Sequence, residues 1–301
     1  MNNIILLFVC LLLGMGLRTT RRLPENAHVA LNAFIINISL PALIILQIHH
    51  VALQTQLLFS IAMPWLMFAL GVGFFWMLSS RLKFSRETTG ALMLAGGLAN
   101  TSFVGLPMIE AFFGASNMAT GILIDQLGSY LVLSTLGITV AAIYSAGTES
   151  KTAVFKRVLT FPPLLALIAA FILMPFEFPE WVSDALKRLG DTLSPLALVS
   201  VGFQLRFDQT TGLKTALATG LGFKLFLAPI VIASIYFIVL GTGEEITRVT
   251  LFEAGMGPMI GGAIVAAQHG LNPPLVSLMV GVGISLSFLT LPLWSYALHH
   301  L

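Results

Sequence analysis

The chain has 301 residues, of which 57% are hydrophobic and only 9% are charged. Roughly a quarter of the residues of a soluble domain are charged, so this composition excludes an ordinary water-soluble protein. The formal net charge of +2 comes from short, scattered basic loops, which excludes nucleic acid as a partner. The single cysteine, Cys10, excludes an intrachain disulfide.

Long apolar runs define the expected secondary structure. A helical membrane span needs about 20 apolar residues, whereas a membrane β-barrel shows short alternating segments. The runs here are continuous, for example 59–78, 217–240 and 275–298. The first run is followed, not preceded, by basic residues, which indicates a retained span and not a signal peptide. The sequence therefore predicts an all-α integral membrane protein.

Ten transmembrane helices are expected, called predicted helices 1 to 10 below. Their ranges are 3–17, 29–48, 57–80, 88–112, 117–145, 159–176, 190–205, 213–240, 247–268 and 274–298.

The loops after predicted helices 1, 3, 5 and 7 hold most of the basic residues of the chain, and cytoplasmic loops are the ones enriched in Lys and Arg. These residues are Arg18, Arg21, Arg22, Arg81, Lys83, Arg86, Lys151, Lys156, Arg157, Arg206 and Lys214. We therefore expect both termini on the outer, periplasmic side of a bacterial inner membrane.

The two halves of the chain show weak internal symmetry. Pro-Met-Ile occurs at 107–109 in predicted helix 4 and again at 258–260 in predicted helix 9, about half the chain apart. Pro41 in predicted helix 2 and Pro195 in predicted helix 7 are similarly spaced. Because each half has five helices, related halves must be inverted. The expected organisation is two inverted five-helix repeats, residues 1–145 and 146–301.

Predicted helices 4 and 9 are rich in residues that interrupt a helix. Gly105 and Pro107 mark the first interruption, and Gly255 and Gly261 mark the second. Glycine frees the backbone and proline removes a hydrogen-bond donor, so both spans are expected to break near the middle of the membrane. Matched breaks in two halves are the best sequence indication of a transporter's binding site.

The residues at these breaks are the candidate substrate ligands. Asn100, Thr101 and Ser102 supply polar side chains at the first break, and Gly257 and Pro258 supply loose backbone at the second. Half-helix N-termini attract anions, whereas half-helix C-termini and loose carbonyls attract cations. The alternative interpretation is that both breaks are packing kinks, which are common in membrane helices.

Acidic residues inside spans are costly and usually functional. Glu253, just before the second break, is the strongest candidate for binding a coupling ion, and Asp125 with Gln126 is the next. The alternative for Glu253 is a position among the lipid headgroups. Glu110 and Lys224 are left open: Glu110 fits a helix end as well, and Lys224 fits either a partner for an acid or a residue that reaches the interface.

No motif in the sequence indicates an enzyme. The chain has no nucleotide-binding Gly-rich loop, no metalloprotease histidine pair and no nucleophile elbow. Ser102 with Asp125 is the one faint nucleophile–base pair. We expect no enzymatic activity and no cofactor, with Na⁺ as a candidate coupling ion.

Residues 100–107, with Asn100 followed by Phe-Val-Gly-Leu-Pro at 103–107, resemble the auxin efflux carrier family. The resemblance implies a scaffold of helices 1, 2, 6 and 7, and a transport core of helices 3–5 and 8–10. It also implies crossing helices 4 and 9, elevator-like alternating access, a homodimer, and a small organic anion such as malate or malonate as substrate. Plant members have Asn-Pro at both crossings, and this chain has neither, which argues against auxin itself.

Glu253-Ala-Gly-Met256 is similar to a stretch of bile acid:sodium symporters, a related fold. That resemblance implies a Na⁺ site formed by Glu253 and the carbonyl of Met256, with Asn100 and Thr101. The expected function is thus secondary transport of a mono- or dicarboxylate across the lipid bilayer, coupled to Na⁺ or H⁺. The alternatives are a passive uniporter or channel and a non-transporting membrane sensor.

Overall fold

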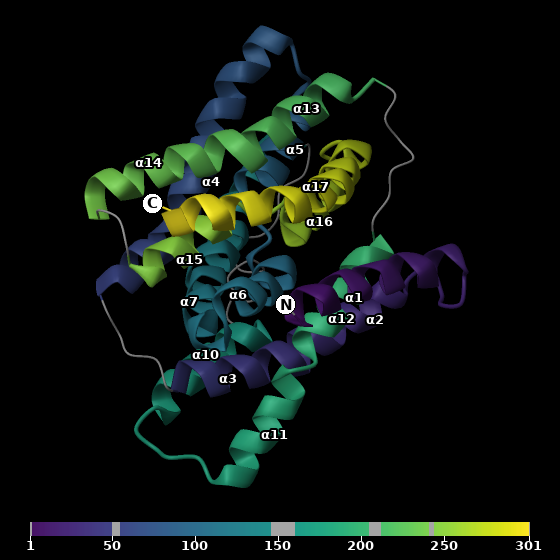
Figure 1. Ribbon diagram of the computed structural model, residues 1–301. Coiled ribbons are helices and arrows are strands. Elements are labelled where there is room, and N and C mark those ends of the chain that lie inside the picture. The colour runs from purple at the N-terminus through teal and green to yellow at the C-terminus, as the bar shows by residue number, and fades with distance from the viewer. Residues whose placement is uncertain (1, 50–54, 146–159, 205–211, 241–243, 301) are drawn as a thin grey trace. The chain divides into compact units, whose positions relative to one another are not determined.

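The computed structural model describes residues 2–49, 55–145, 160–204, 212–240 and 244–300, and within these ranges every regular element is a helix (Figure 1). The first half contains α1 (Asn2–Thr19), α2 (Ala27–Phe34), η1 (Ile35–Ser39), α3 (Leu40–His49), α4 (Thr55–Leu82), α5 (Arg86–Gly97), η2 (Thr101–Gly105), α6 (Leu106–Phe113), η3 (Ala115–Asn117), α7 (Met118–Leu123), η4 (Ile124–Tyr130), η5 (Leu133–Gly137) and α8 (Ile138–Tyr144). The second contains α10 (Pro162–Leu173), α11 (Glu180–Gly190), α12 (Leu193–Gln204), α13 (Lys214–Gly222), η6 (Phe223–Leu227), α14 (Ala228–Leu240), α15 (Glu245–Ala254), α16 (Ile260–Gln268) and α17 (Pro273–His300).

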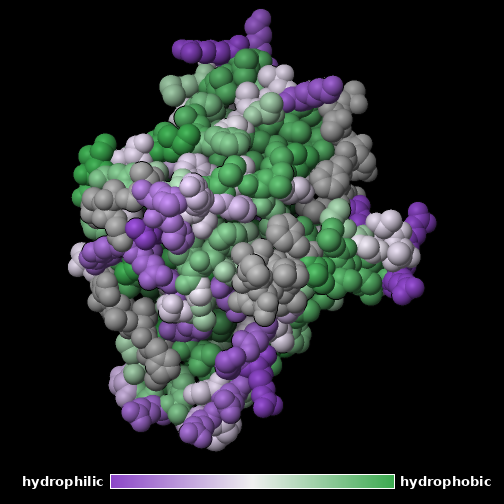
Figure 2. Space-filling model, viewed as in Figure 1, coloured by the Kyte–Doolittle hydropathy of each residue, from purple (hydrophilic) through white to green (hydrophobic). Residues whose placement is uncertain are grey.

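Several helical stretches are suited to lipid. Among the described residues, five stretches are long and apolar enough to cross a membrane, namely 27–48, 55–82, 115–144, 214–239 and 273–300. Shorter apolar helices cover 9–19, 101–113 and 162–173. Hydrophobic side chains such as Ile238 and Leu293 are 85% and 68% exposed, and hydrophobic residues cover much of the visible face (Figure 2). The chain is a multi-pass membrane protein, while ten spans and an inverted repeat stay predictions.

The structure has one helix in a stretch where the sequence predicts a loop. Between predicted helices 6 and 7, α11 runs from Glu180 to Gly190. It is amphipathic, and Lys187 and Asp191 form an exposed ion pair of 2.9 Å at the end of the helix. Eleven residues are too few to span a membrane, so a search for long apolar runs misses such a helix.

The chain forms two compact units. Unit 1 comprises residues 1–54, 102–122 and 155–205, and unit 2 comprises 55–101, 123–154 and 206–301. Each unit takes segments from both halves of the sequence. The predicted repeat boundary between 145 and 146 divides the chain into sequence halves and not into compact units. It stays a prediction, because residues 146–159 lie outside the described residues. Lys151, Lys156, Arg157 and Arg206, used above for orientation, lie outside them too.

In unit 1, α1 and α12 lie side by side (Figure 1). A Cβ atom at Gly14 of α1 would overlap the carbonyl oxygen of Val199, and one at Gly202 of α12 would overlap that of Leu11. The two backbones therefore approach closely because both helices have glycine at the contact. Small residues serve this purpose in membrane helices generally, since packing and not water exclusion drives their association.

Polar side chains join other helices of unit 1. The hydroxyl oxygens of Ser39 and Thr192 are 2.7 Å apart. The Ser194 hydroxyl donates a 2.8 Å hydrogen bond to the carboxylate of Glu110, a residue whose role the sequence does not decide. Glu110 is thus bonded within unit 1, where hydrogen bonds between helices replace those that water would provide.

In unit 2, glycines bring α4, α5 and α16 together. A Cβ at Gly71 of α4 would lie 2.8 Å from the Cα of Gly97, and one at Gly262 of α16 would lie 3.0 Å from the Leu94 carbonyl oxygen of α5. Residues 90–97 of α5 are all buried. This tight packing fixes the end of α5, where the candidate site begins.

Candidate functional site at a crossing of two interrupted helices

Unit 2 contains two helices that stop inside the protein. The segment after α5 is extended at Leu98 (φ −114°, ψ 138°), and the segment before α16 is extended at Met259 (φ −71°, ψ 125°). The Asn100 amide donates to the Gly257 carbonyl at 2.9 Å, and the Met259 amide donates to the Leu98 carbonyl at 3.2 Å. Ala99 and Pro258 thereby form an isolated antiparallel bridge.

This pairing explains how both helices can break inside a membrane protein. Backbone groups that leave a helix need new partners in lipid, and here each extended segment supplies them for the other. Both segments in which the sequence predicts an interruption are non-helical, at residues 98–100 and 255–259. We call this pair of segments the crossing.

The residues expected to cause the breaks lie close to the crossing in sequence but not all within it. Gly255 caps α15, and Gly261 lies in the first turn of α16. Gly105 ends η2, and Pro107 lies in the first turn of α6, where a missing amide hydrogen is tolerated. Gly105 and Pro107 belong to unit 1, as does the candidate ligand Ser102.

Gly257 and Pro258, expected to contact substrate, pack on α17. A Cβ at Gly257 would lie 3.1 Å from the Cα of Ile284 and 3.1 Å from the hydroxyl oxygen of Ser287. A Cβ at Gly283 would lie only 2.5 Å from the Pro258 ring. One face of the segment 255–259 therefore packs against α17, and the Pro258 ring fits there because residue 283 has no side chain.

Three of the polar residues singled out from the sequence meet in one buried cluster. The Thr101 hydroxyl donates to one carboxylate oxygen of Asp125 at 2.6 Å, and the Gln126 amide donates to the other at 2.6 Å. All three side chains are at most 1% exposed, and Asn100, the next residue before Thr101, is 2% exposed. The first break thus lies beside a carboxylate that two side-chain donors hold.

Glu253 occupies a second buried position, near the end of α15. It is 0% exposed, and neither carboxylate oxygen has a hydrogen-bond partner among the described residues. Met256, the other expected ion ligand, is also fully buried, and its amide donates to the Glu253 carbonyl at 3.1 Å. A buried carboxylate without donors needs a proton or a cation, because an isolated charge is strongly destabilised there.

Lys224, which the sequence left undecided, bonds the backbone of the residue that follows Glu253. It is 0% exposed in η6, and its ammonium group donates to the Ala254 carbonyl at 3.1 Å and lies 3.9 Å from the sulfur of Met67. The interpretation as a residue that reaches the interface is therefore wrong, since the whole side chain is buried.

Polar contacts that the sequence does not predict join helices around the site. The hydroxyl oxygens of Thr250 on α15 and Ser60 on α4 are 2.7 Å apart, and Trp294 on α17 donates to the Leu225 carbonyl at 3.2 Å. Isolated hydroxyls and tryptophans far apart in sequence carry no signal that they meet. Within the described residues, no group of three or more His, Cys, Asp or Glu side chains forms a metal-binding cluster.

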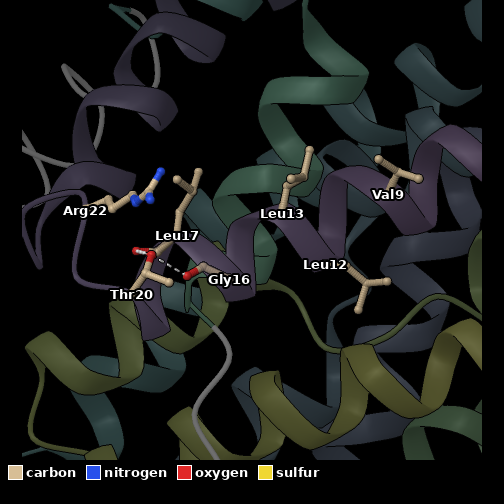
Figure 3. A pocket seen from close by; sticks show the side chains of 7 residues that line it. All are labelled: Val9, Leu12, Leu13, Gly16, Leu17, Thr20 and Arg22. Atoms are coloured by element: carbon tan, nitrogen blue, oxygen red, sulfur yellow. Dashed lines mark hydrogen bonds between the residues drawn. The ribbon is translucent and has the colours of Figure 1, made fainter.

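Two apolar grooves lie elsewhere, one on each unit. The groove of unit 1 measures about 400 Å³ and follows α1, where its polar groups are the Thr20 hydroxyl, bonded to Gly16, and Arg22 at one end (Figure 3). The groove of unit 2 measures about 460 Å³ between α4 and η6–α14, and apolar residues alone line it. Neither groove offers a buried polar cluster to a charged solute, whereas the crossing has one beside it.

Comparison with known proteins decides the family. A family model described as membrane transport protein matches residues 1–295. The chain belongs to the auxin efflux carrier family. An uncharacterized transporter of Methanothermobacter thermautotrophicus is 27% identical over 99% of this chain and 98% of its own length. Another, from Methanocaldococcus jannaschii, is 26% identical over the same shares.

Family membership establishes the broad class of this auxin efflux carrier homologue. It is a membrane transport protein, as the composition and the interrupted helices indicate. That class agrees with the expectation of no enzymatic activity. The match covers both units of the chain, so the crossing of unit 2 lies within the part that the family shares.

Proposed function

We propose that this protein is a secondary transporter of a small organic anion, either a mono- or a dicarboxylate. The observation that carries the proposal is the crossing, where two extended segments pair next to buried polar side chains. The helical turns that follow it begin at Thr101 and Ile260, and helix N-termini present free amides and positive dipole ends. Asn100 and Thr101 add side-chain polarity suited to a carboxylate.

The charges buried in unit 2 support coupling to a cation. Asp125 and Glu253 are both acidic, and Lys224 provides one positive charge. Ionisation of all three leaves one net negative charge, which would oppose entry of an organic anion. Binding of one Na⁺ or one proton removes that charge, so the anion and the cation are expected to bind together. We propose that this coupling makes the transport active.

Movement between the two sides is proposed to be elevator-like. The division into two compact units supports this, because a carrier of this kind needs a body that moves and a body that stays. We assign the moving role to unit 2, since it contains the crossing, and the static role to unit 1. We further propose outward-facing termini and a homodimer through helices of unit 1.

The rival function is a passive channel or uniporter. Both would let the anion equilibrate, whereas a coupled carrier accumulates it against its gradient. A carboxylate that binds is first identified because it raises the melting temperature of the purified protein. The protein is then reconstituted in liposomes, and uptake of the same carboxylate in radiolabelled form is measured. Accumulation driven by a Na⁺ or H⁺ gradient supports the proposal, and equilibration without accumulation in either gradient refutes active transport.

Asn100→Ala tests the position of the substrate. We expect it to weaken carboxylate binding by about tenfold, equivalent to about 1.4 kcal/mol, which is the size of one good hydrogen bond. The matched control is Asn37→Ala, because Asn37 is exposed and bonds only the Ala33 carbonyl of its own helix. Equal carboxylate affinity in the Asn100→Ala variant and the wild type would remove Asn100 from the proposed site.

A further inference from the structure

The helix α1 has apolar side chains on two faces, and the faces differ in what they meet. Gly14 lies on the face that packs against α12, where a Cβ atom would overlap the Val199 carbonyl oxygen. Gly16 lies on another face, where a Cβ atom would meet no atom of the described residues within 4 Å. The groove of unit 1 follows this second face, and its lining residues are Val9, Leu12, Leu13, Gly16, Leu17, Thr20 and Arg22 (Figure 3).

The apolar part of this groove has the length of one lipid leaflet. Val9, Leu12 and Leu13 are 44%, 62% and 55% exposed, so they present their hydrocarbon surface to whatever surrounds the protein. Eleven residues separate Val9 from Thr20 (20 − 9), which is roughly 16 Å along an α-helix. Half of the hydrocarbon core of a bilayer is about 15 Å thick. One acyl chain of a lipid therefore matches the groove in chemistry and in length.

Arg22 gives the groove a charged end. It is the charged residue among the seven that line the groove, since the other polar one, Thr20, bonds the Gly16 carbonyl of its own helix at 2.8 Å. No acidic side chain of the described residues forms an ion pair with Arg22. A guanidinium group pairs well with phosphate, because its N–H groups form a fork that matches two phosphate oxygens.

The backbone at the end of α1 fixes the place of this arginine. Arg21 has a φ of 50°, in the left-handed region that side chains other than glycine rarely adopt. The Arg21 amide donates to the Arg18 carbonyl at 3.0 Å, and the Arg22 amide donates to the Leu17 carbonyl at 3.3 Å. This pair of bonds reverses the chain at a helix end, and it brings Arg22 back to Leu17 at the groove. The helix end carries about half a negative charge, which the full charges of both arginines outweigh.

We propose that the groove of unit 1 binds an anionic phospholipid, with one acyl chain along α1 and the phosphate group on Arg22. The sequence predicts that Arg22 lies on the cytoplasmic side, where the leaflet is rich in anionic lipids. The groove of unit 2 is the internal contrast, because apolar residues alone line it and nothing there distinguishes one headgroup from another. This inference is independent of the transported substrate and of the coupling ion.

The first test compares two lipids that differ only in the headgroup. The melting temperature of the purified protein in detergent is measured as phosphatidylglycerol or phosphatidylcholine with identical acyl chains is added. We expect phosphatidylglycerol to raise the melting temperature at a mole fraction about fivefold lower, which is the contribution of one arginine near a charged lipid. Inorganic phosphate, which has no acyl chain, is expected to produce no rise. Equal responses to the two lipids, or a rise with phosphate alone, would overturn the proposal.

The second test removes the charged end. Arg22→Gln is expected to abolish the difference between the two lipids. Arg81→Gln is the matched control, because Arg81 is an exposed arginine in the last turn of α4 that is predicted to lie on the same side of the membrane. The control variant is expected to keep the preference for phosphatidylglycerol. A preference that survives in Arg22→Gln, or that is lost equally in both variants, would assign it to general surface charge and contradict the site.

The third test fills the groove. Gly16→Leu places a side chain where the acyl chain would lie, and it should weaken the response to phosphatidylglycerol. Gly73→Leu is the matched control, since Gly73 lines the groove of unit 2 and a Cβ atom there also meets no atom of the described residues within 4 Å. Light scattering is expected to show the same oligomeric state for both variants and the wild type. A full lipid response in Gly16→Leu would refute the site, and so would a change from dimer to monomer in that variant alone, because a second copy of the chain would then occupy the groove.

Discussion

The hydrogen bond between Thr101 and Asp125 can be broken with little change of shape. Thr101→Val removes the hydroxyl and keeps the branched side chain. The bond is 2.6 Å long, and the two residues are 0% and 1% exposed, so water cannot replace the lost donor. Hydrogen bonds between membrane helices average only about 0.6 kcal/mol, but a bond to a charged group contributes about 1.5–3 kcal/mol.

We expect the higher range here because the acceptor is a buried carboxylate. The carboxylate keeps one hydrogen-bond donor, the Gln126 amide, so we expect the loss of stability in Thr101→Val to stay at about 2 kcal/mol. A double-mutant cycle with Asp125→Ala, which removes the acceptor, isolates the pair, with stability measured by reversible unfolding in mixed micelles. The expected coupling energy is about 1.5–2.5 kcal/mol, within the range known for contacting residues.

Thr135→Val is the matched control for this prediction. Thr135 is exposed, and its hydroxyl bonds the Leu131 carbonyl one turn back in its own helix. Its loss should change stability by less than about 0.5 kcal/mol, as for other surface changes. A Thr101–Asp125 coupling energy below about 0.5 kcal/mol would show that the carboxylate is neutral or hydrated, and the reasoning about the cluster would be wrong.

Two further predictions concern glycine contacts and a third concerns a buried hydrogen bond, and reversible unfolding measures each. Gly14→Ala should destabilise the protein by about 1–3 kcal/mol through its clash with the Val199 carbonyl. Gly16→Ala, whose new methyl group meets no atom within 4 Å, should instead stabilise α1 by about 0.5–1 kcal/mol. Changes in stability of the same sign in both variants would contradict the close contact of α1 and α12. Gly283→Ala should displace the Pro258 ring and lower the stability by about 1–3 kcal/mol, whereas Gly222→Ala, in open space, should not lower it. A Gly283→Ala variant as stable as the wild type would place the crossing elsewhere. Tyr236→Phe should cost about 1 kcal/mol by removing the hydrogen bond from its hydroxyl to the Phe59 carbonyl, whereas Tyr296→Phe, at a residue 70% exposed, should cost nothing measurable. Equal effects would refute the buried bond.

The glycines of the second interruption lie where the helix stops, because their effect is local. Glycine and proline change what the backbone can do at their own positions, and the non-helical residues 255–259 lie between Gly255 and Gly261. The first interruption nevertheless lies before Gly105 and Pro107, at 98–100. The reason is not local, because the extended segment 98–100 is stabilised by pairing with 257–259. No residue near 98 indicates from its own type that this partner exists.

The chemistry of the candidate site was predicted residue by residue but not as an arrangement. Asp125, Gln126 and Thr101 were each singled out, yet only the structure shows that two of them donate to the third. Lys224 stood between two interpretations, because a lysine in an apolar run is compatible with either. The helix α11 was missed because its short, charged, amphipathic pattern differs from that of a membrane span. Local chemistry is readable from sequence, whereas contacts between distant helices are not.

The pairing of the two extended segments also bears on how the protein is made. The Asn100 amide bonds the carbonyl of Gly257, which the ribosome adds 157 residues later (257 − 100). At about 5–20 residues per second, that partner follows after roughly 8–30 s. Until then the backbone groups at 98–100 lack these partners, and lipid offers no hydrogen bonds in their place. The first half of the chain must therefore wait in a provisional conformation, and biogenesis is complete only when the last helices arrive and close the crossing.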